Sequence, residues 1–251
     1  MEKIFAEIIG TMIFVFLGNG VVANVILSKT KGNNNSKNGE WLTIAMGWAF
    51  AVFMGIIVSA PYSGAHLNPC VTISFAIIGK LNWEMVPLYI FSQLIGAMLG
   101  SLLVWIYYKD HFLKTEKKED KLSVFVTIPS IKNLFLNFLN EVLATFFFIF
   151  ISFYLTTEGT LFLGKKYTIG LGSLEAFPTA LVVLGIVLSL GGTTGPAINP
   201  TRDLGPRIIH SIIPIYGKGK SNWDYAFIPV LGPIVGSVIA ATLYLFLSKN
   251  L

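Results

Sequence analysis

Six long apolar stretches, each carrying at most one charged residue, constrain this sequence more than any other feature. A helix needs about 20 apolar residues to cross about 30 Å of hydrocarbon, and charged side chains within it are costly. Only 12% of the 251 residues are charged, well below the quarter that is typical of soluble domains. We therefore expect an all-α membrane protein with six transmembrane helices. The predicted spans are Ile4 to Leu27, Trp41 to Ala60, Met85 to Tyr108, Phe135 to Thr156, Ala176 to Leu190 and Tyr225 to Leu247.

Polar segments separate the apolar stretches, and their composition is typical of loops in water. The longest carries a run of lysines and glutamates. We expect all four to be solvated connections. They are Ser28 to Glu40, Lys109 to Lys132, Glu158 to Glu175 and Ile212 to Asp224.

Two apolar regions are too long or too broken for a simple helical span. From Trp41 to Gly79 there are 39 consecutive residues without Asp, Glu, Lys or Arg, interrupted by prolines and glycines. Gly191 to His210 is likewise apolar at its start and broken by Gly and Pro. Non-helical backbone at membrane depth is tolerated only when it is buried in protein or lines a water-filled cavity. Both regions are therefore predicted to be re-entrant segments around a pore.

The two halves of the chain repeat the same markers in the same order. Residues 5–11 match 139–145, residues 63–69 match 194–200, and residues 96–101 match 232–237. This indicates a single channel domain built of two units, about 1–132 and 133–251, each with three spans and one broken segment. Because three is odd, the second unit enters the membrane from the opposite face, which gives an inverted repeat.

Each broken segment contains an Asn-Pro pair, Asn68-Pro69 in the first unit and Asn199-Pro200 in the second. Asn is a preferred N-cap and Pro a preferred first helical residue, so each pair predicts the start of a helix. Pro69 to Gly79 would be roughly 16 Å long, about half the bilayer. We expect two half-helices whose positive dipole ends meet at the membrane midplane and repel cations and protons.

The short loops before the two asparagines are predicted to run extended, with backbone carbonyls facing the lumen. The asparagine amides and Arg202 supply hydrogen-bond donors beside these acceptors. A neutral, hydrogen-bonding solute suits such a path, whereas an ion would lack partners. The predicted pore carbonyls belong to Gly64, Ala65, His66, Leu67, Gly195, Ala197 and Ile198.

Two motifs in this sequence are specific enough to indicate a protein family. They are residues 63–72, Ser-Gly-Ala-His-Leu-Asn-Pro-Cys-Val-Thr, and residues 194–203, Thr-Gly-Pro-Ala-Ile-Asn-Pro-Thr-Arg-Asp. Together with the repeat, they make essentially the whole chain resemble the major intrinsic proteins, the aquaporin and glycerol facilitator family. The resemblance implies six tilted helices with two half-helices, a pore in each subunit and a homotetramer. It also implies an outer selectivity filter, made of Trp48, Val187, Pro196 and Arg202.

Asp203, directly after Arg202, resembles the marker of the glycerol-conducting branch, as do Arg207 and the pair Pro229-Val230. The resemblance therefore implies glycerol conduction with some water. The chain departs from the glycerol pattern at Pro196, where a second aromatic is usual, and at Cys70 and Thr201, where Ala is usual. A channel mainly for water, urea, dihydroxyacetone or undissociated lactic acid stays open as the alternative.

Two acids, Glu7 and Glu141, lie within apolar spans at matched positions of the repeat. We expect each to accept backbone N–H groups from a broken segment and so to act as a scaffold, in preference to a proton relay. His66 has no counterpart in the second unit, which has Ala197. A structural role for His66 is favoured over a pH gate, and a packing role for Cys70 over a reactive thiol.

Other classes of protein fit the sequence poorly. It contains no G-x-S-x-G elbow and no cluster of metal-ligand residues, so we expect neither an enzyme nor a bound metal or cofactor. A net charge of +5 is too small to indicate nucleic-acid binding. A secondary transporter and a purely structural membrane protein are the remaining alternatives. We expect a multi-pass protein of the bacterial plasma membrane; the family resemblance places both termini in the cytoplasm, whereas the lysine distribution favours the opposite orientation.

Overall fold

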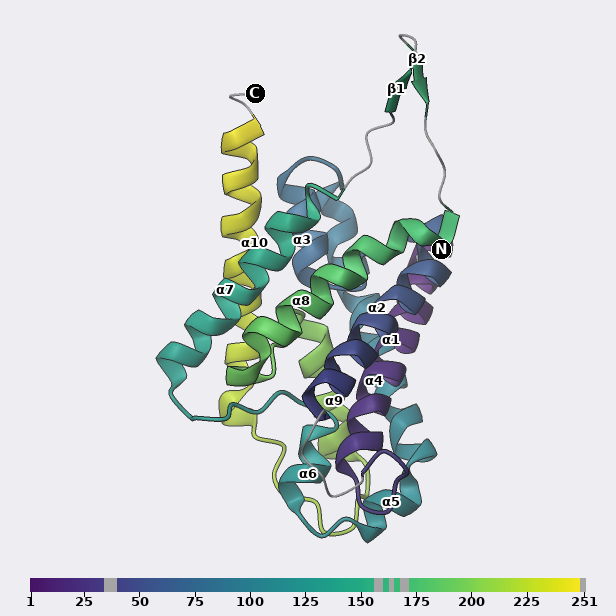
Figure 1. The fold of residues 1–251 in the computed structure, drawn as a ribbon, viewed down its shortest axis with the longest axis vertical. Coiled ribbons are helices and arrows are strands. Elements are labelled where there is room, and N and C mark those ends of the chain that lie inside the picture. Colours follow the sequence, from purple (N-terminus) through teal and green to yellow (C-terminus); the bar gives the residue numbers. More distant parts are fainter. Residues whose placement is uncertain (34–39, 156–159, 163–164, 168–171, 249–251) are drawn as a thin grey trace.

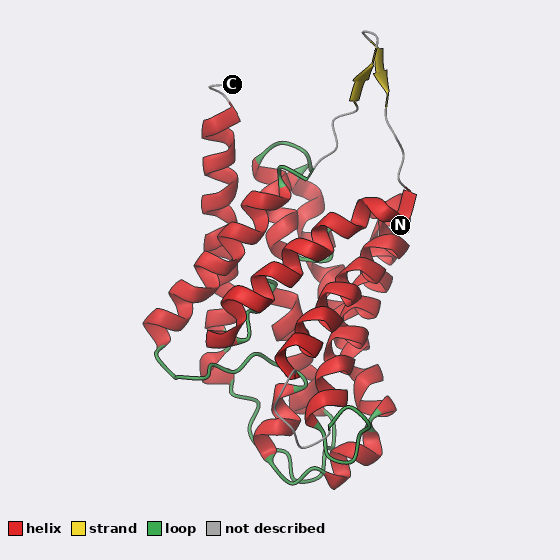
Figure 2. Ribbon diagram, in the orientation of Figure 1, coloured by secondary structure: helices red, strands yellow, loops and turns green. Residues whose placement is uncertain are grey.

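The structure is a computed structural model that describes residues 1–33, 40–155, 160–162, 165–167 and 172–248. Most of this part of the chain is helical (Figure 2). It contains six helices that are long and apolar enough to cross a membrane, which confirms the predicted membrane fold. They are α1 (Glu2–Ile26), α2 (Glu40–Ser63), α4 (Val86–Tyr107), α7 (Leu134–Ser152), α8 (Phe177–Thr194) and α10 (Phe227–Ser248).

The largest boundary differences are at the fourth and fifth spans. Helix α7 ends at Ser152, before the predicted Thr156, and α8 continues to Thr194, beyond the predicted Leu190. Gly191 and Gly192 therefore lie inside a helix, which composition alone argued against. Parts of the polar connections that start at Ser28 and Glu158 lie outside the described residues.

Two short helices follow the Asn-Pro pairs, as the sequence predicts: α3 (Pro69–Ile77) and α9 (Pro200–Ile212). Figure 1 shows α3 toward the end of the molecule where the chain termini lie and α9 toward the opposite end. The remaining elements are short. They are η1 (Trp83–Met85), α5 (Lys109–Lys114), α6 (Lys118–Ser123), η2 (Gly172–Ala176), η3 (Trp223–Tyr225) and the antiparallel strands β1 (Thr160–Phe162) and β2 (Lys165–Tyr167).

The packing of the helices repeats between the two halves of the chain. Helix α1 packs against α2 and α4, and α7 packs against α8 and α10 in the same way. Each half-helix then crosses over: α9 packs on α4 of the first half, and α3 packs on α10 of the second. This exchange of half-helices joins the two halves of the repeat.

Glycines bring the third span of each half into direct contact with the first. A Cβ atom at Gly96 or Gly100 would lie 2.4 or 2.6 Å from a carbonyl oxygen of α1. At Gly236 it would lie 2.2 Å from the Val142 carbonyl oxygen of α7. The absence of side chains at these positions lets the helix backbones touch within the subunit.

The connection Lys109 to Lys132 differs from its prediction as a solvated loop. Its aromatic residues Phe112 and Phe125 are buried and stack on each other, with ring centroids 5.6 Å apart. They join a hydrophobic cluster that also contains Val15 of α1 and Ile209 of α9. The charged residues of this segment obscured an apolar face that folds back onto the helices.

Candidate functional site

The sequence-predicted pore residues line one cavity of about 390 Å³. Its walls come from α1, α2, α7, α8, the two half-helices with the loops that precede them, and the connection between α4 and α7. The scaffold acids, the two prolines of the Asn-Pro pairs and Asp203 lie outside this wall. The predicted residues that the cavity brings together are Trp48, Gly64, Ala65, His66, Leu67, Asn68, Val187, Gly195, Pro196, Ala197, Ile198, Asn199 and Arg202.

Asn68 and Asn199 hold the two half-helices and the two loops together. The Asn68 side-chain oxygen caps α3 by accepting the Cys70 N–H at 2.8 Å, and Asn199 caps α9 likewise. Each amide nitrogen donates across the repeat, Asn68 to the Ile198 carbonyl and Asn199 to the Leu67 carbonyl, both at 2.9 Å. A primary amide carries two N–H groups, so each asparagine keeps a second donor for the cavity.

The loops before the asparagines are not extended, which corrects the sequence-based expectation. Gly64, Ala65 and Leu67 have φ angles of +82°, +53° and +51°, and Gly195 and Ile198 have +63° and +44°. Left-handed backbone costs roughly 1–2 kcal/mol per non-glycine residue, so other contacts must hold it. These turns change the direction of successive peptide groups, and the N–H groups that point away from the cavity meet the buried acids.

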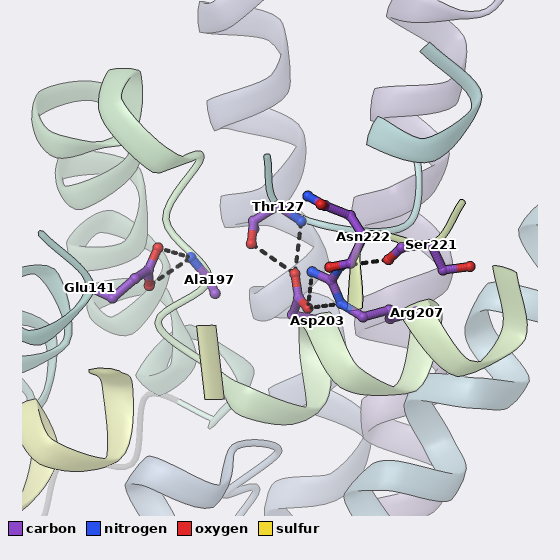
Figure 3. Close-up of polar contacts among 7 residues, drawn as sticks. All are labelled: Thr127, Glu141, Ala197, Asp203, Arg207, Ser221 and Asn222. Atoms are coloured by element: carbon purple, nitrogen blue, oxygen red, sulfur yellow. Dashed lines mark hydrogen bonds and ion pairs between the residues drawn. The ribbon is translucent and has the colours of Figure 1, made fainter. Parts of the chain in front are cut away.

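Glu7 and Glu141 accept those N–H groups. Glu7 accepts the N–H of His66 at 3.0 Å and of Leu67 at 2.8 Å, while Glu141 accepts those of Ala197 and Ile198 at 3.1 and 3.2 Å. Figure 3 shows the Glu141 carboxylate facing Ala197. Both acids are buried, at 0% and 1% exposure, and each also binds a side-chain hydroxyl, of Ser63 or Thr194. Each carboxylate thus satisfies the buried backbone N–H groups of one strained loop.

His66 is held by three side chains from its own half of the repeat. Its Nδ1 lies 3.2 Å from the Thr72 hydroxyl, and its ring contacts Phe75 and Tyr89 with centroids 5.0 Å away in each case. Cys70 is fully buried in a hydrophobic cluster that also contains Ile149 of α7 and Ala241 of α10, and it is absent from the wall of the cavity. These surroundings favour a packing role for both side chains.

Arg202 and Trp48 lie together in the cavity. The Arg202 guanidinium carbon is 4.2 Å from the Trp48 ring centroid, a cation–π contact. Among the described residues, the buried Nη1 atom of Arg202 has no hydrogen-bond partner. Trp48 is fixed from behind, because a Cβ atom at Gly18 would lie 2.1 Å from its ring and Phe14 packs edge-on at 5.5 Å. The site therefore places a guanidinium group beside a rigid apolar face in the cavity wall.

Asp203 does not pair with Arg202, an alternative that their adjacency suggests. It forms a fully buried ion pair with Arg207 at 2.6 Å, and it accepts both the N–H and the hydroxyl of Thr127 at 2.8 and 2.7 Å. Arg207 in turn donates to the carbonyls of Ser221 and Asn222 (Figure 3). Asp203 and Arg207 thus tie two connecting segments to α9.

Lys218 binds backbone carbonyls at the carboxyl end of α9 (Pro200–Ile212), and Lys121 binds one in the segment that follows it. Lys218 donates to the carbonyls of His210 and Ile213 at 2.5 Å, and Lys121 donates to the Tyr216 carbonyl at 2.5 Å. Positive charge is favourable at the negative end of a helix dipole. Partial burial lowers the pKa of both ammonium groups.

Sequence reasoning missed several residues of the cavity wall. Val126, Thr127 and Ile128 come from the connection that was expected to be solvated, and no local signal marks them. Trp41 of α2 also lines the cavity, and its position seven residues before Trp48 was a usable signal. No group of metal-ligating side chains occurs in the described parts of the chain.

Comparison with known proteins identifies the family to which this chain belongs. The family model described as major intrinsic protein matches residues 1–244. The chain is 45% identical to the glycerol uptake facilitator protein of Streptococcus pneumoniae (strain ATCC BAA-255 / R6), over 97% of this chain and 98% of the relative. It is 43% identical to the probable glycerol uptake facilitator protein of Thermotoga maritima, with coverage of 97% and 98%. The structure of the aquaglyceroporin from Plasmodium falciparum superposes with a TM-score of 0.80 at 32% identity, over 97% and 94% of the two chains. The chain therefore belongs to the major intrinsic protein family.

Proposed function

We propose that this protein is a passive channel that conducts glycerol, and some water, across the plasma membrane. The observation that carries the proposal is the pairing of Arg202 with Trp48 in the cavity wall. Glycerol has hydroxyl groups along one edge and carbon along the other, so it fits a guanidinium donor beside an aromatic face. The similarity of this chain to glycerol uptake facilitator proteins supports the same conclusion. The protein is a channel and not an enzyme.

The centre of the cavity accounts for selectivity against ions. The N-termini of α3 and α9 meet there, at Asn68 and Asn199, so two positive dipole ends face the solute. A cation or a hydrated proton is repelled at this point, whereas a hydroxyl oxygen accepts the free amide N–H groups. We assign the pore role to these two residues and the scaffold role to Glu7 and Glu141.

A second candidate is a wider range of small neutral solutes, including water, urea, dihydroxyacetone and undissociated lactic acid. Val187 and Pro196 favour it, because neither carries an aromatic ring at its place in the cavity wall. An apolar wall by itself discriminates only modestly between small solutes. Glycerol remains the first choice, because Arg202 can bind its hydroxyl groups and Trp48 can contact its carbon edge.

The test is stopped-flow light scattering on proteoliposomes, with gradients of water, glycerol, urea and lactic acid. Fast glycerol flux with a low activation energy supports the channel, and a steep temperature dependence would indicate a transporter. Trp48→Ala and Arg202→Ala should each change the ranking of solutes, because they remove the apolar face and the donor respectively. Water flux without glycerol flux would contradict the proposal, and no flux above empty liposomes would favour a structural protein.

The proposal extends to assembly and domain organisation. We infer that residues 1–251 form one channel domain whose two repeats divide near residue 132, and that four copies form a homotetramer. The large apolar side chains exposed on the outer helices fit burial against lipid or neighbouring subunits. Light scattering of the detergent-solubilised protein, corrected for bound detergent, would measure the number of subunits.

A further inference from the structure

Trp41 occupies a position in the cavity wall that the filter residues do not explain. It lies in the first turn of α2, seven residues before Trp48. Seven residues are close to two full helical turns, so the two indoles project from the same side of α2, about 10 Å apart along its axis. Both line the same cavity. Trp41 therefore stands further toward the end of the molecule at which α2 begins.

Contacts with α8 hold the Trp41 ring in this place. Its indole N–H donates to the carbonyl oxygen of Val187 at 3.1 Å. A Cβ atom at Gly191 would lie 2.3 Å from Trp41 Cζ2 and 3.0 Å from the Cδ atom of Pro196. Gly191 thus leaves the space in which the Trp41 ring and the Pro196 ring come together. An indole that served only as an anchor in the membrane interface would have no need of this fitted space.

The partners of Trp41 are the two filter positions with small side chains. Val187 and Pro196 add no aromatic ring to the cavity wall, and the Trp41 indole binds the backbone of Val187 and lies beside Pro196. With 37% of its surface exposed, Trp41 keeps part of its ring open for contact.

We propose that Trp41 is a further specificity-determining residue, which supplies the second aromatic wall of the solute path just outside Trp48 and Arg202. This inference rests on the proposed function, since it concerns which small polyols the channel admits. A linear polyol would lay its carbon edge on Trp41 before it reaches Trp48. The ring also narrows the approach, so that longer or branched solutes are disfavoured.

The experiment compares glycerol and erythritol permeability of proteoliposomes that contain equal amounts of wild-type protein, Trp41→Ala or Trp41→Phe. We expect Trp41→Ala to raise the erythritol-to-glycerol ratio by about threefold or more, because an apolar wall discriminates modestly by size and its removal relaxes that discrimination. Trp41→Phe should give an intermediate ratio, since it keeps an aromatic ring but loses the hydrogen bond to Val187. Trp83→Ala is the matched control, because Trp83 is 58% exposed and is not among the residues that line the cavity.

The outcomes separate this inference from the proposed function. If wild-type protein conducts no glycerol, the proposed function fails. Suppose that wild-type protein conducts glycerol and that Trp48→Ala shifts the erythritol-to-glycerol ratio. If Trp41→Ala then leaves this ratio unchanged, the inference about Trp41 is refuted while the proposed function stands. Equal losses of flux in Trp41→Ala and Trp83→Ala, with an unchanged ratio, would identify Trp41 as an interfacial anchor and overturn the inference. Trp41→Phe keeps the test valid if Trp41→Ala fails to fold.

Discussion

Asp203 and Arg207 form an ion pair one helical turn apart on α9, with 2.6 Å between Oδ1 and Nη2 and no solvent exposure of either side chain. The sequence predicted both residues to be markers of the glycerol-conducting branch, yet neither lines the cavity. Their partners are Thr127 in one connecting segment and the carbonyls of Ser221 and Asn222 in another. Thr127 itself lines the cavity. The pair therefore holds Thr127 in its place in the cavity wall.

Asp203→Asn is expected to destabilise the protein strongly. The substitution keeps the shape of the side chain but leaves the buried Arg207 charge unpaired, which costs about 3–5 kcal/mol. The measurement is the free energy of unfolding in detergent, followed by the fluorescence of the five tryptophans.

A matched double variant separates the cost of an unpaired buried charge from the loss of the hydrogen bonds to the connecting segments. Asp203→Asn combined with Arg207→Met should recover most of the lost stability, because the uncompensated charge is gone. Thr127→Val, which removes one hydroxyl donor and keeps the backbone N–H, should cost only about 1 kcal/mol. Equal stability of Asp203→Asn and wild type would contradict the role of the pair.

Glu7→Gln and Glu141→Gln are expected to weaken the two loops. Every contact of these carboxylates is with a donor, including Gln93 Nε2 at 2.8 Å from Glu7. An amide offers one acceptor and one competing donor, so each substitution leaves donors unpaired at about 1–3 kcal/mol apiece. Unfolding free energy should fall in both variants, and glycerol flux should fall with it.

The same variants test the proton-relay alternative for the two acids. A pH-sensitive dye inside the proteoliposomes reports proton leak, which a scaffold role leaves unchanged. Reduced proton flux at unchanged stability would instead support a relay. Gln93→Leu is a useful companion variant, because it removes one donor to Glu7 and leaves the carboxylate itself in place.

The Lys132–Asp224 pair predicts a weak pH dependence. A hydrogen bond from Lys132, 3.2 Å away, lowers the pKa of Asp224 below its usual 3.8. A carboxyl group with a lowered pKa stabilises the fold above its unfolded pKa, and this contribution is lost as the pH falls through the folded value. The melting temperatures of wild type and Lys132→Met should therefore differ slightly near neutrality and converge below pH 3.8. A difference that grows in acid would refute this assignment.

The membrane fold could be predicted because its signals are local. Apolar stretches locate the spans, and each Asn-Pro pair specifies a helix start by its own capping chemistry, as α3 and α9 confirm. The repeat supplied the long-range information, since matched markers imply matched packing. The Asp203–Arg207 pair also had a local signal, the four-residue spacing that brings side chains together on a helix.

The remaining features depend on tertiary contacts and left no mark in the sequence. Positive φ angles at Ala65, Leu67 and Ile198 are unusual for these residue types, and they persist because the loops are held by buried carboxylates and by asparagines from the other repeat. The segment Lys109 to Lys132 was expected in water because its charges outnumber its buried aromatics. Its apolar residues find partners only once α1 and α9 are in place.

The helix-contact glycines give a prediction with an internal control. Gly236→Ala places a methyl group 2.2 Å from the Val142 carbonyl oxygen, and Gly96→Ala places one 2.4 Å from the Ile8 carbonyl oxygen. Helix backbones cannot yield as a flexible side chain would, so α10 must move from α7, or α4 from α1, at a cost of about 1–3 kcal/mol. Gly20→Ala in α1 is the control, since nothing lies within 4 Å of its Cβ position. It should leave stability unchanged or raise it by up to about 1 kcal/mol through helix propensity. Melting temperatures in detergent measure all three variants, and equal effects at Gly20 and Gly236 would mean that helix propensity, and not close packing, explains these glycines.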